Sequence, residues 1–229
     1  MMTAESNRPD LSESQEDYLK QILLLEETEG TANTKALAGR LNVRPASVTE
    51  MVGRLAHLGL VEHAPYRGTR LTEPGRKVAL EVLRHHRLLE TYLVEVLGYT
   101  WDQVHEEAER LEHVISERFE KRIAAVLGHP THDPHGDPIP DEKLRMPTTG
   151  RPVPLSEFAA GSAGTIIRVT AQDGKTLDYI AKLGLGPGCR IEVVEKKKTE
   201  YQLRCGANDL VVALDLAREL WIEGEERCD

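Results

Sequence analysis

Two short helices joined by a tight connection constrain the fold of this chain more than any other feature of its sequence. Thr34–Leu41 has the pattern of a first helix, and Pro45–Leu55 that of a second, which follows after Asn42 and Val43. Proline favours the first position of a helix because its missing N–H would have no partner there anyway. Two helices connected this closely are typical of a helix-turn-helix. We therefore expect this motif near the N-terminus.

The next segment extends the motif to a winged helix. Leu60–Ala64 and Thr69–Thr72 have the composition of strands around Pro65–Gly68, which predicts a β-hairpin wing. Residues 31–76 hold seven Lys or Arg and three Asp or Glu, a local charge of +4 (7 − 3), although the whole chain carries −9. Contacts with DNA phosphates need such a basic region. A winged helix used only for protein contacts is the alternative.

The second helix of the motif has one apolar face and one face free to contact DNA. Val48, Val52 and Leu55 are expected to point inward. Small side chains at the start of the helix could approach base edges in the major groove, and wing arginines could reach phosphates. The predicted DNA-contacting residues are Arg44, Ala46, Ser47, Thr49, Glu50, Arg54, Tyr66, Arg67 and Arg70.

A single long helix is predicted from Trp101 to Leu127, and it concentrates carboxylates and imidazoles. Residues three and four apart are neighbours on a helix surface. One stripe of this helix would therefore hold four potential metal ligands: His105, Glu109, Glu112 and His113. Neighbouring carboxylates repel each other, and a divalent cation, for which Asp, Glu and His are usual ligands, would remove that repulsion. The alternative is a solvated acidic face with two incidental histidines.

Two other helices offer further ligands. His86 and Glu90 stand one turn apart in the helix predicted for Pro74–Leu97, and Asp17 lies in the second turn of the first helix, which Ser12 would cap. Three helices could therefore direct nitrogen and oxygen ligands into one space. A zinc hydrolase is a competing interpretation. The metalloprotease motifs are absent, however, because Glu109 stands where either motif needs a histidine.

Composition narrows the class of protein. The chain has 229 residues, of which 40% are hydrophobic and 29% charged, as in ordinary globular proteins. No apolar run is long enough for a membrane span or a signal peptide, so we expect a cytoplasmic location and no membrane partner. Cys189, Cys205 and Cys228 are odd in number and widely spaced, which predicts free thiols in a reducing compartment.

The last third of the chain has a different composition. Short β-rich runs alternate with glycines from Val153 onward, and a helix is predicted for Thr176–Leu183. This pattern is typical of a small β-barrel. Residues 128–152 are rich in Pro, His, Gly and Asp, and we interpret them as a surface connection, in which His129, His132 and His135 have no helical register to converge on a metal.

Together these motifs resemble the diphtheria-toxin-repressor (DtxR/MntR) family of metal-dependent repressors. The resemblance covers essentially the whole chain and includes Arg44–Met51, Tyr66–Gly68 and Pro134–Pro140. It implies a homodimeric repressor whose affinity for double-stranded operator DNA is switched by Mn²⁺ or Fe²⁺. It also implies a mainly α fold with small β elements, divided into a winged helix-turn-helix domain (1–75), a helical metal-binding and dimerisation domain (76–150) and an SH3-like, FeoA-like domain (151–229).

The resemblance also implies two metal sites. The primary site would consist of Asp17, Glu109, Glu112 and His113, and the ancillary site of His86, Glu90 and His105, with Asp178 as a possible further ligand from the C-terminal domain. Iron-sensing members resemble this site but carry Met and Cys where Asp17 and Glu109 stand, so we expect Mn²⁺, with Fe²⁺ as the alternative. Manganese-sensing members usually have an acid where Lys20 stands, which argues against a binuclear centre. Two other classes stay open: a metalloenzyme with the same ligands, and a metal-independent DNA-binding or scaffold protein.

Overall fold

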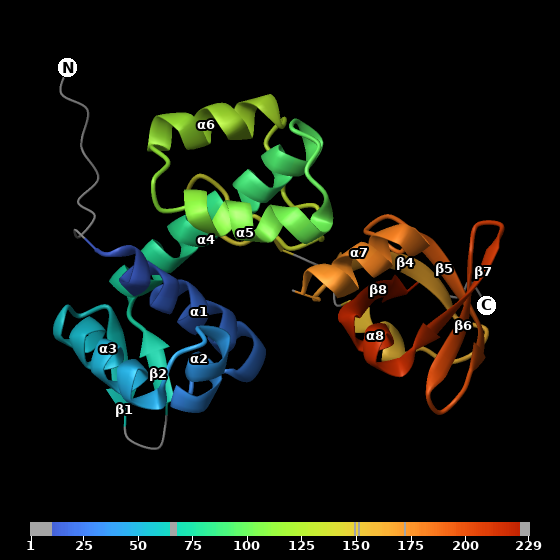
Figure 1. The fold of residues 1–229 in the computed structure, drawn as a ribbon, viewed down its shortest axis with the longest axis horizontal. Coiled ribbons are helices and arrows are strands. Elements are labelled where there is room, and N and C mark those ends of the chain that lie inside the picture. The colour runs from blue at the N-terminus through green and yellow to red at the C-terminus, as the bar shows by residue number, and fades with distance from the viewer. Residues whose placement is uncertain (1–10, 65–67, 149, 151, 172, 225–229) are drawn as a thin grey trace. The chain divides into compact units, whose positions relative to one another are not determined.

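The computed structural model describes residues 11–64, 68–148, 150, 152–171 and 173–224, shown as a ribbon in Figure 1. The chain forms two compact units. The first comprises the residues up to His85 together with 112–114 and 142–145, and the second comprises 86–111, 115–141 and the residues from 146 onward. The division falls inside one long helix, α4 (Glu73–Glu95).

The first unit contains the predicted winged helix. Its elements are α1 (Glu13–Glu29), α2 (Thr34–Arg40), α3 (Pro45–His57), β1 (Val61–Ala64), β2 (Gly68–Leu71) and the first half of α4. Ser12 caps α1, and a capping box with Gln15 satisfies two N–H groups of its first turn, as predicted. Pro45 is the first residue of α3. Strands β1 and β2 pair antiparallel, with Val61 opposite Leu71.

Apolar side chains from all three short helices form the core of the winged helix. The fully buried ones include Leu19, Ile22, Leu23, Leu37, Val48 and Leu55. At the start of α4, Gly75 lies so close to β1 that a Cβ atom there would be 1.9 Å from the Leu60 carbonyl oxygen. The wing is thus held against α4 by a contact that only glycine permits. Tyr66 and Arg67, predicted at the wing tip, lie outside the described residues.

The prediction of a single helix from Trp101 to Leu127 is wrong. The structure has α5 (Trp101–Leu111), a turn over residues 112–114, and a new helix α6 (Glu117–Val126). Ser116 ends the continuity, because its side chain accepts the Phe119 N–H as an N-cap, and Glu117 and Glu120 place negative charge in the first turn of α6. As a result, Glu112 and His113 lie in a turn and not on a helix face.

The second unit joins the end of α4, α5 and α6 around an apolar core. That core includes Leu88, Leu89, Leu93, Val104, Ala108, Ile123 and Ile139. Ile139 belongs to the segment predicted to be a surface connection, and in this respect the prediction is wrong, because Asp133, His135 and Ile139 are all buried. His129 and His132, by contrast, are exposed.

The buried part of this segment packs against the C-terminal sheet within the second unit. The Val169 N–H donates to the His135 carbonyl oxygen at 2.8 Å. Gly136 has φ +86°, and a Cβ atom there would lie 1.9 Å from the Ile167 carbonyl oxygen. Arg168 forms an ion pair with Asp137 at 2.5 Å. Residues 133–137 are therefore an interface to the strand that carries Ile167 and Arg168.

The C-terminal part is the small β domain expected from the sequence. Its elements are β3 (Val153–Pro154), η1 (Leu155–Glu157), β4 (Ala163–Val169), α7 (Gly174–Leu183), β5 (Arg190–Lys196), β6 (Glu200–Cys205), β7 (Asn208–Ala213), α8 (Leu214–Glu219) and β8 (Leu220–Gly224). The six strands form one antiparallel sheet in the order β3-β8-β4-β5-β6-β7. Ile166, Val193, Tyr201 and Ile222 are among its fully buried residues.

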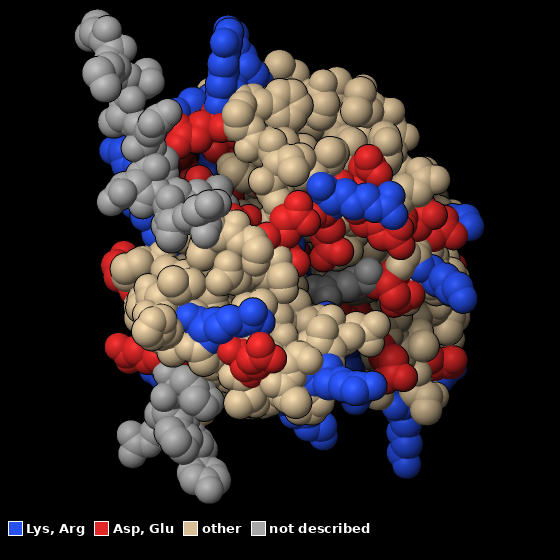
Figure 2. Space-filling model, turned by 60° about the vertical axis from the view of Figure 1, so that its left-hand side comes forward, with Lys and Arg blue, Asp and Glu red and all other residues tan. Residues whose placement is uncertain are grey.

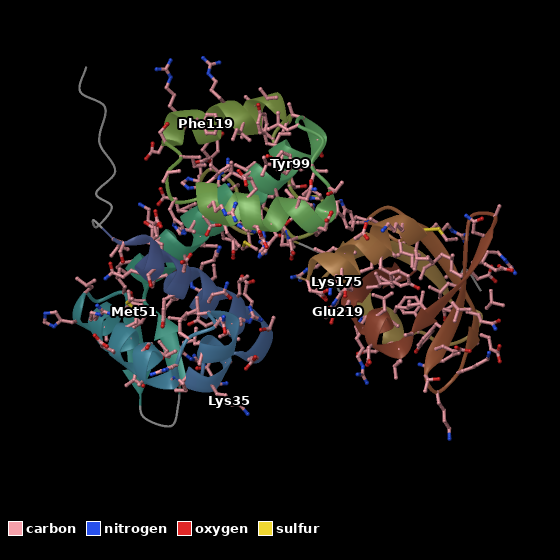
Figure 3. All side chains as sticks on the ribbon, viewed as in Figure 1. Lys35, Met51, Tyr99, Phe119, Lys175 and Glu219 are labelled. Atoms are coloured by element: carbon pink, nitrogen blue, oxygen red, sulfur yellow. A yellow bond between two sulfur atoms is a disulfide. The ribbon has the colours of Figure 1, made fainter. Side chains whose placement is uncertain are left out.

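The cysteines depart from the sequence-based expectation. Cys189, just before β5, and Cys205, at the end of β6, form a disulfide, the yellow bond in Figure 3, so the prediction of free thiols is wrong for this pair. Cys228 lies outside the described residues. Among the helices that the structure describes, none is both long and apolar enough to cross a membrane.

Candidate metal centres and nucleic-acid interface

Helix α1 and the turn after α5 bring four ionisable side chains together in the first unit. His113 is at their centre: its Nδ1 lies 2.6 Å from Glu16 Oε2, and its Nε2 lies 3.0 Å from Asp17 Oδ1 and 3.4 Å from Glu112 Oε1. Glu16 and Asp17 are consecutive residues of α1, whereas Glu112 and His113 belong to the turn. We call these four residues the His113 cluster.

The His113 cluster concentrates negative charge in a shielded place. Glu16 and Glu112 are buried, and the side chain of His113 is only 7% exposed. Burial acts to lower the pKa of His113, but hydrogen bonds to Asp17 and Glu16 and the charge of Glu112 raise this pKa to about 10. The protonated imidazole therefore supplies a positive charge among three carboxylates. A divalent cation could replace that charge, because ligand atoms of Asp17, Glu112 and His113 all lie within 4.8 Å of one another.

Two further buried contacts hold Glu112 in place. The ammonium group of Lys20, one turn after Asp17 on α1, donates to Glu112 Oε1, and both side chains are almost fully buried. His85 Nδ1 lies 3.0 Å from the Glu112 carbonyl oxygen. Lys20 thus places a fixed positive charge beside one carboxylate oxygen of a candidate metal ligand. Lys20 is also the residue that, from the family resemblance, argues against a binuclear centre.

A separate group of ligands lies in the second unit. His86 Nε2 is 3.0 Å from Glu90 Oε1, one turn along α4, and His105 Nδ1 of α5 is 3.1 Å from the same oxygen. The two imidazoles approach to 3.2 Å. Burial acts to raise the pKa of Glu90, but the charge of His86 and hydrogen bonds from His105 and His86 hold this pKa well below its usual value. The predicted ancillary residues are therefore brought together.

Glu90 is shared with two buried residues, His135, which the sequence interpretation assigned to a surface connection, and Asp133, which it did not consider. Ligand atoms of Glu90, Asp133 and His135 lie within 4.8 Å of one another. Burial raises the pKa of Asp133 well above its usual value, and the charges of Asp137 and Glu90 raise it further. Among the residues that the structure describes, the buried Nε2 atom of His135 has no hydrogen-bond partner. An unsatisfied imidazole nitrogen beside two carboxylates suits a cation.

We call the five residues His86, Glu90, His105, Asp133 and His135 the Glu90 cluster. Its second half was missed because Asp133 and His135 belong to an irregular, proline-rich segment. Helical spacing cannot indicate convergence in such a segment. The sequence signals are the recurrence of histidine at residues 129, 132 and 135, which we interpreted as a surface connection, and the pair of ligand types two residues apart.

Glu109 and Asp178 differ from the other predicted ligands. Glu109 Oε1 lies 3.5 Å from His105 Nε2, beside the Glu90 cluster, and Glu109 is not one of the three residues that gather around His113. Burial acts to lower the pKa of His105, but hydrogen bonds to Glu109 and Glu90 raise it to about 10. Asp178 is half-buried and pairs with Lys182 at 2.5 Å, one turn along α7.

The predicted DNA-contacting face of α3 is exposed. Val48, Val52 and Leu55 are buried, whereas the predicted contact residues that the structure describes are exposed: Arg44, Ala46, Ser47, Thr49, Glu50, Arg54 and, on β2, Arg70. Lys35 projects from the outer side of α2, and Met51 lies in the core under α3 (Figure 3). On the face drawn in Figure 2, Lys and Arg side chains are scattered and form no continuous patch, and the net charge of the chain is −9. Attraction to phosphate therefore depends on local basic residues.

Comparison with known proteins covers nearly all of the described chain. The family model for the N-terminal DNA-binding domain of iron-dependent repressors matches residues 10–69, and the model for their metal-binding and dimerisation domain matches residues 72–141. A FeoA domain model matches residues 153–224. Each of the three parts of the chain thus has a counterpart of its own.

Similar whole proteins include both iron-dependent and manganese-dependent repressors. The diphtheria toxin repressor of Corynebacterium diphtheriae is 39% identical over 227 residues, 93% of this chain and 98% of that protein. The iron-dependent repressor IdeR of Mycobacterium tuberculosis is 38% identical over 195 residues, 80% and 85% of the two chains. A solved manganese-dependent transcriptional repressor in complex with manganese is 36% identical, with a TM-score of 0.85, and the match covers 92% of this chain and 100% of that one.

Proposed function

Because the chain belongs to the iron-dependent repressor family, whose members include the diphtheria toxin repressor, we propose that it is a manganese-responsive repressor controlled at the His113 cluster. The family consists of DNA-binding, metal-dependent transcriptional repressors and not of enzymes, and this chain is a metal-dependent transcriptional repressor. The proposal concerns the ion that it senses, the residues that bind this ion and the way in which binding reaches the DNA.

The composition of the His113 cluster is the observation that favours manganese. Asp17, Glu112 and His113 offer only oxygen and nitrogen atoms, and the neighbouring Glu16 adds another carboxylate. Hard oxygen ligands suit Mn²⁺, whereas thiolate and thioether ligands favour softer metals. Fe²⁺ is the alternative, since similar proteins include iron-dependent repressors. We propose the Glu90 cluster as the ancillary site, with Asp133 and His135 as ligands additional to His86, Glu90 and His105.

The proposed mechanism follows from the origin of the ligands. A bound divalent cation supplies the positive charge that the carboxylates otherwise take from protonated His113. Asp17 comes from α1 of the winged helix, and Glu112 and His113 come from a turn 95 residues or more along the chain, so joint ligation of a metal ion by these residues would fix α1 in one position. The winged helix is thereby held in the conformation that binds DNA best, and linkage requires that operator DNA strengthen metal binding by the same factor.

The remaining parts of the proposal concern partners and location. We propose that the exposed side chains of α3 and the wing contact operator DNA, and that the three-domain division at residues 75 and 150 holds. Phe119 and Val126 on α6 are large apolar residues that are 46% and 66% exposed, and we propose that they contribute to a homodimer contact. We also propose a cytoplasmic location, because a repressor acts where its operator DNA is.

The central experiment measures operator binding as a function of metal. The probe is a duplex selected from random-sequence DNA by the Mn²⁺-loaded protein, and its binding is followed by fluorescence anisotropy without oxygen. We expect half-maximal activation at a Mn²⁺ concentration no higher than that of Fe²⁺, and no activation in the presence of a chelator. Activation by Fe²⁺ at much lower concentration would contradict the manganese assignment, and chelator-resistant binding would contradict metal control.

A second experiment tests the assignment of α3. Ala46→Glu places a carboxylate where the helix should meet base edges and phosphates, and we expect it to abolish specific binding while Mn²⁺ binding is unchanged. The exposed residue Ala56, later in the same helix, provides the matched control Ala56→Glu. Normal operator binding by the Ala46→Glu protein would show that α3 is not the recognition helix.

A further inference from the structure

Glu26 joins three elements of the first unit near the end of α1. Its Oε1 accepts the Leu71 N–H of β2 at 2.7 Å, and its Oε2 accepts a hydrogen bond from the guanidinium group of Arg76 in the first turns of α4. The side chain of Glu26 is only 9% exposed. Hydrogen bonds to a charged carboxylate are short, strong and directional, so this side chain fixes α1 to both β2 and α4.

Two backbone hydrogen bonds place the same strand against the segment that follows α1. Ala32 N–H donates to Thr69 O at 3.1 Å, and Thr69 N–H donates to Ala32 O at 2.8 Å. Thr69 and Leu71 flank Arg70, the exposed wing residue predicted to contact phosphate. The backbone on both sides of Arg70 is therefore attached to α1 or to the residues directly after it.

Helix α1 also carries a ligand of the His113 cluster. Asp17 and Glu26 are nine residues apart, roughly 13 Å along the helix axis. Leu19, Ile22, Leu23 and Leu25, which lie between them, are all buried. A helix packed along this length moves as a rigid element, so a change in the position of Asp17 is accompanied by a change at Glu26.

We propose that Glu26 is a positioning residue that transmits the metal-dependent position of α1 to the wing, so that Arg70 meets DNA correctly only when Asp17 is held. This inference rests on the proposed function and adds a route between the metal and the DNA. A buried carboxylate that merely satisfied the Leu71 N–H and Arg76 would affect stability alone. A positioning residue would change the coupling between metal binding and DNA binding, which is a separate quantity.

The test uses the full-length protein with Glu26→Gln, which retains an oxygen acceptor for Leu71 N–H but loses the charge that holds Arg76. Three quantities are measured: Mn²⁺ affinity without DNA, operator Kd with saturating Mn²⁺, and operator Kd with chelator. We expect Mn²⁺ affinity within about twofold of wild type. The ratio of operator Kd with chelator to operator Kd with Mn²⁺ should be approximately tenfold smaller than in wild type. Glu29→Gln, an exposed carboxylate at the end of the same helix, is the matched control and should leave the ratio unchanged.

A second variant covers the case in which Glu26→Gln does not fold. Arg76→Gln keeps the hydrogen bond between Glu26 and Leu71 and removes only the ion pair, and it should reduce the ratio in the same direction by a smaller factor. A wild-type ratio in a folded variant, or equal weakening of both operator Kd values, would overturn the inference. A wild-type protein with no metal dependence would instead contradict the proposed function, so the two failures are distinguishable.

Discussion

The His113 cluster and the Glu90 cluster use the same ligand types but are assembled in opposite ways. His86 and Glu90 are one turn apart on α4, so secondary structure alone places two ligands of the Glu90 cluster side by side. In the His113 cluster, Asp17 reaches a turn more than 90 residues later in the chain. The contact between His86 and Glu90 exists wherever α4 exists, although His105, Asp133 and His135 join it only by tertiary packing. In the His113 cluster, every contact between His113 and α1 depends on where a whole helix lies. A cluster that depends on the position of a helix is suited to switching, and one with two ligands fixed on a single helix is suited to support.

The largest expected effect comes from removing Lys20, the buried ammonium group that contacts Glu112 of the His113 cluster. Lys20→Met leaves the buried carboxylate of Glu112 without its ammonium partner, and removing one partner of a buried ion pair typically costs about 3–5 kcal/mol. We expect a loss of that order in the free energy of unfolding, measured by urea titration with chelator. The loss should be smaller with Mn²⁺, which compensates the same carboxylate. Lys35→Met, at an exposed site on α2, should change little, and an equal loss with and without Mn²⁺ would mean that Lys20 has no connection to the metal.

Removal of one histidine from each cluster compares their roles directly. His113→Ala should abolish the metal-dependent gain in operator affinity, which for a typical allosteric coupling is roughly 5- to 150-fold. His86→Ala should keep most of that gain, because the His113 cluster stays intact. The measurement is operator Kd with chelator and with saturating Mn²⁺ for both proteins. The division into switch and support would be reversed if His86→Ala lost the gain and His113→Ala kept it.

The pH dependence of metal binding sharpens the picture of the switching cluster. The pKa of His113 is raised to about 10, so its imidazole is protonated at pH 7 and must release a proton to bind metal. Apparent Mn²⁺ affinity should rise about tenfold for each pH unit from about 6.5 to 9, whereas an unperturbed histidine would give a flat profile there. In the metal-free protein, the stabilisation by the charged imidazole is complete below about pH 6.5 and is lost as the pH rises toward 10. Calorimetry on the His86→Ala protein, which retains the His113 cluster, should show this slope.

The smallest expected effect concerns Glu109. Its side chain is 49% exposed and contacts His105, so Glu109→Gln should alter metal activation of operator binding by no more than about 1 kcal/mol, the range of an exposed ion pair. The measurement is the Mn²⁺ concentration at half-maximal activation. A loss as large as that of His113→Ala would assign Glu109 to the His113 cluster, as the family resemblance implies.

The sequence was most informative where regular secondary structure carries the pattern. The capping box at Ser12, the proline at the start of α3 and the apolar positions of α3 predicted the winged helix because each acts within a few residues. The spacing of His86 and Glu90, one helical turn apart, likewise predicted that these two ligands of the Glu90 cluster lie side by side. The sequence pattern does not reveal the N-cap at Ser116, so it predicts Glu109, Glu112 and His113 on one helix face, whereas the primary site with Glu109 follows from the family resemblance and stays a prediction.

Long-range contacts account for the features that the sequence left out. Nothing near Glu16 indicates that it reaches His113, and nothing near Asp133 indicates that it meets Glu90, because each contact depends on the packing of separate elements. Lys20 was noted only as a departure from a family pattern. Its role as the buried partner of Glu112 became visible only with the tertiary structure.

The close contact at Gly136 has a mechanical consequence for the Glu90 cluster. There is no room for even one methyl group between residue 136 and the Ile167 carbonyl oxygen, and a hydrogen bond from Val169 and an ion pair with Arg168 fasten the residues on either side. This contact leaves residues 135–137 little freedom to move relative to strand β4. Asp133 and His135, two of the side chains that surround Glu90, are therefore held in place by the contact of residues 135–137 with strand β4.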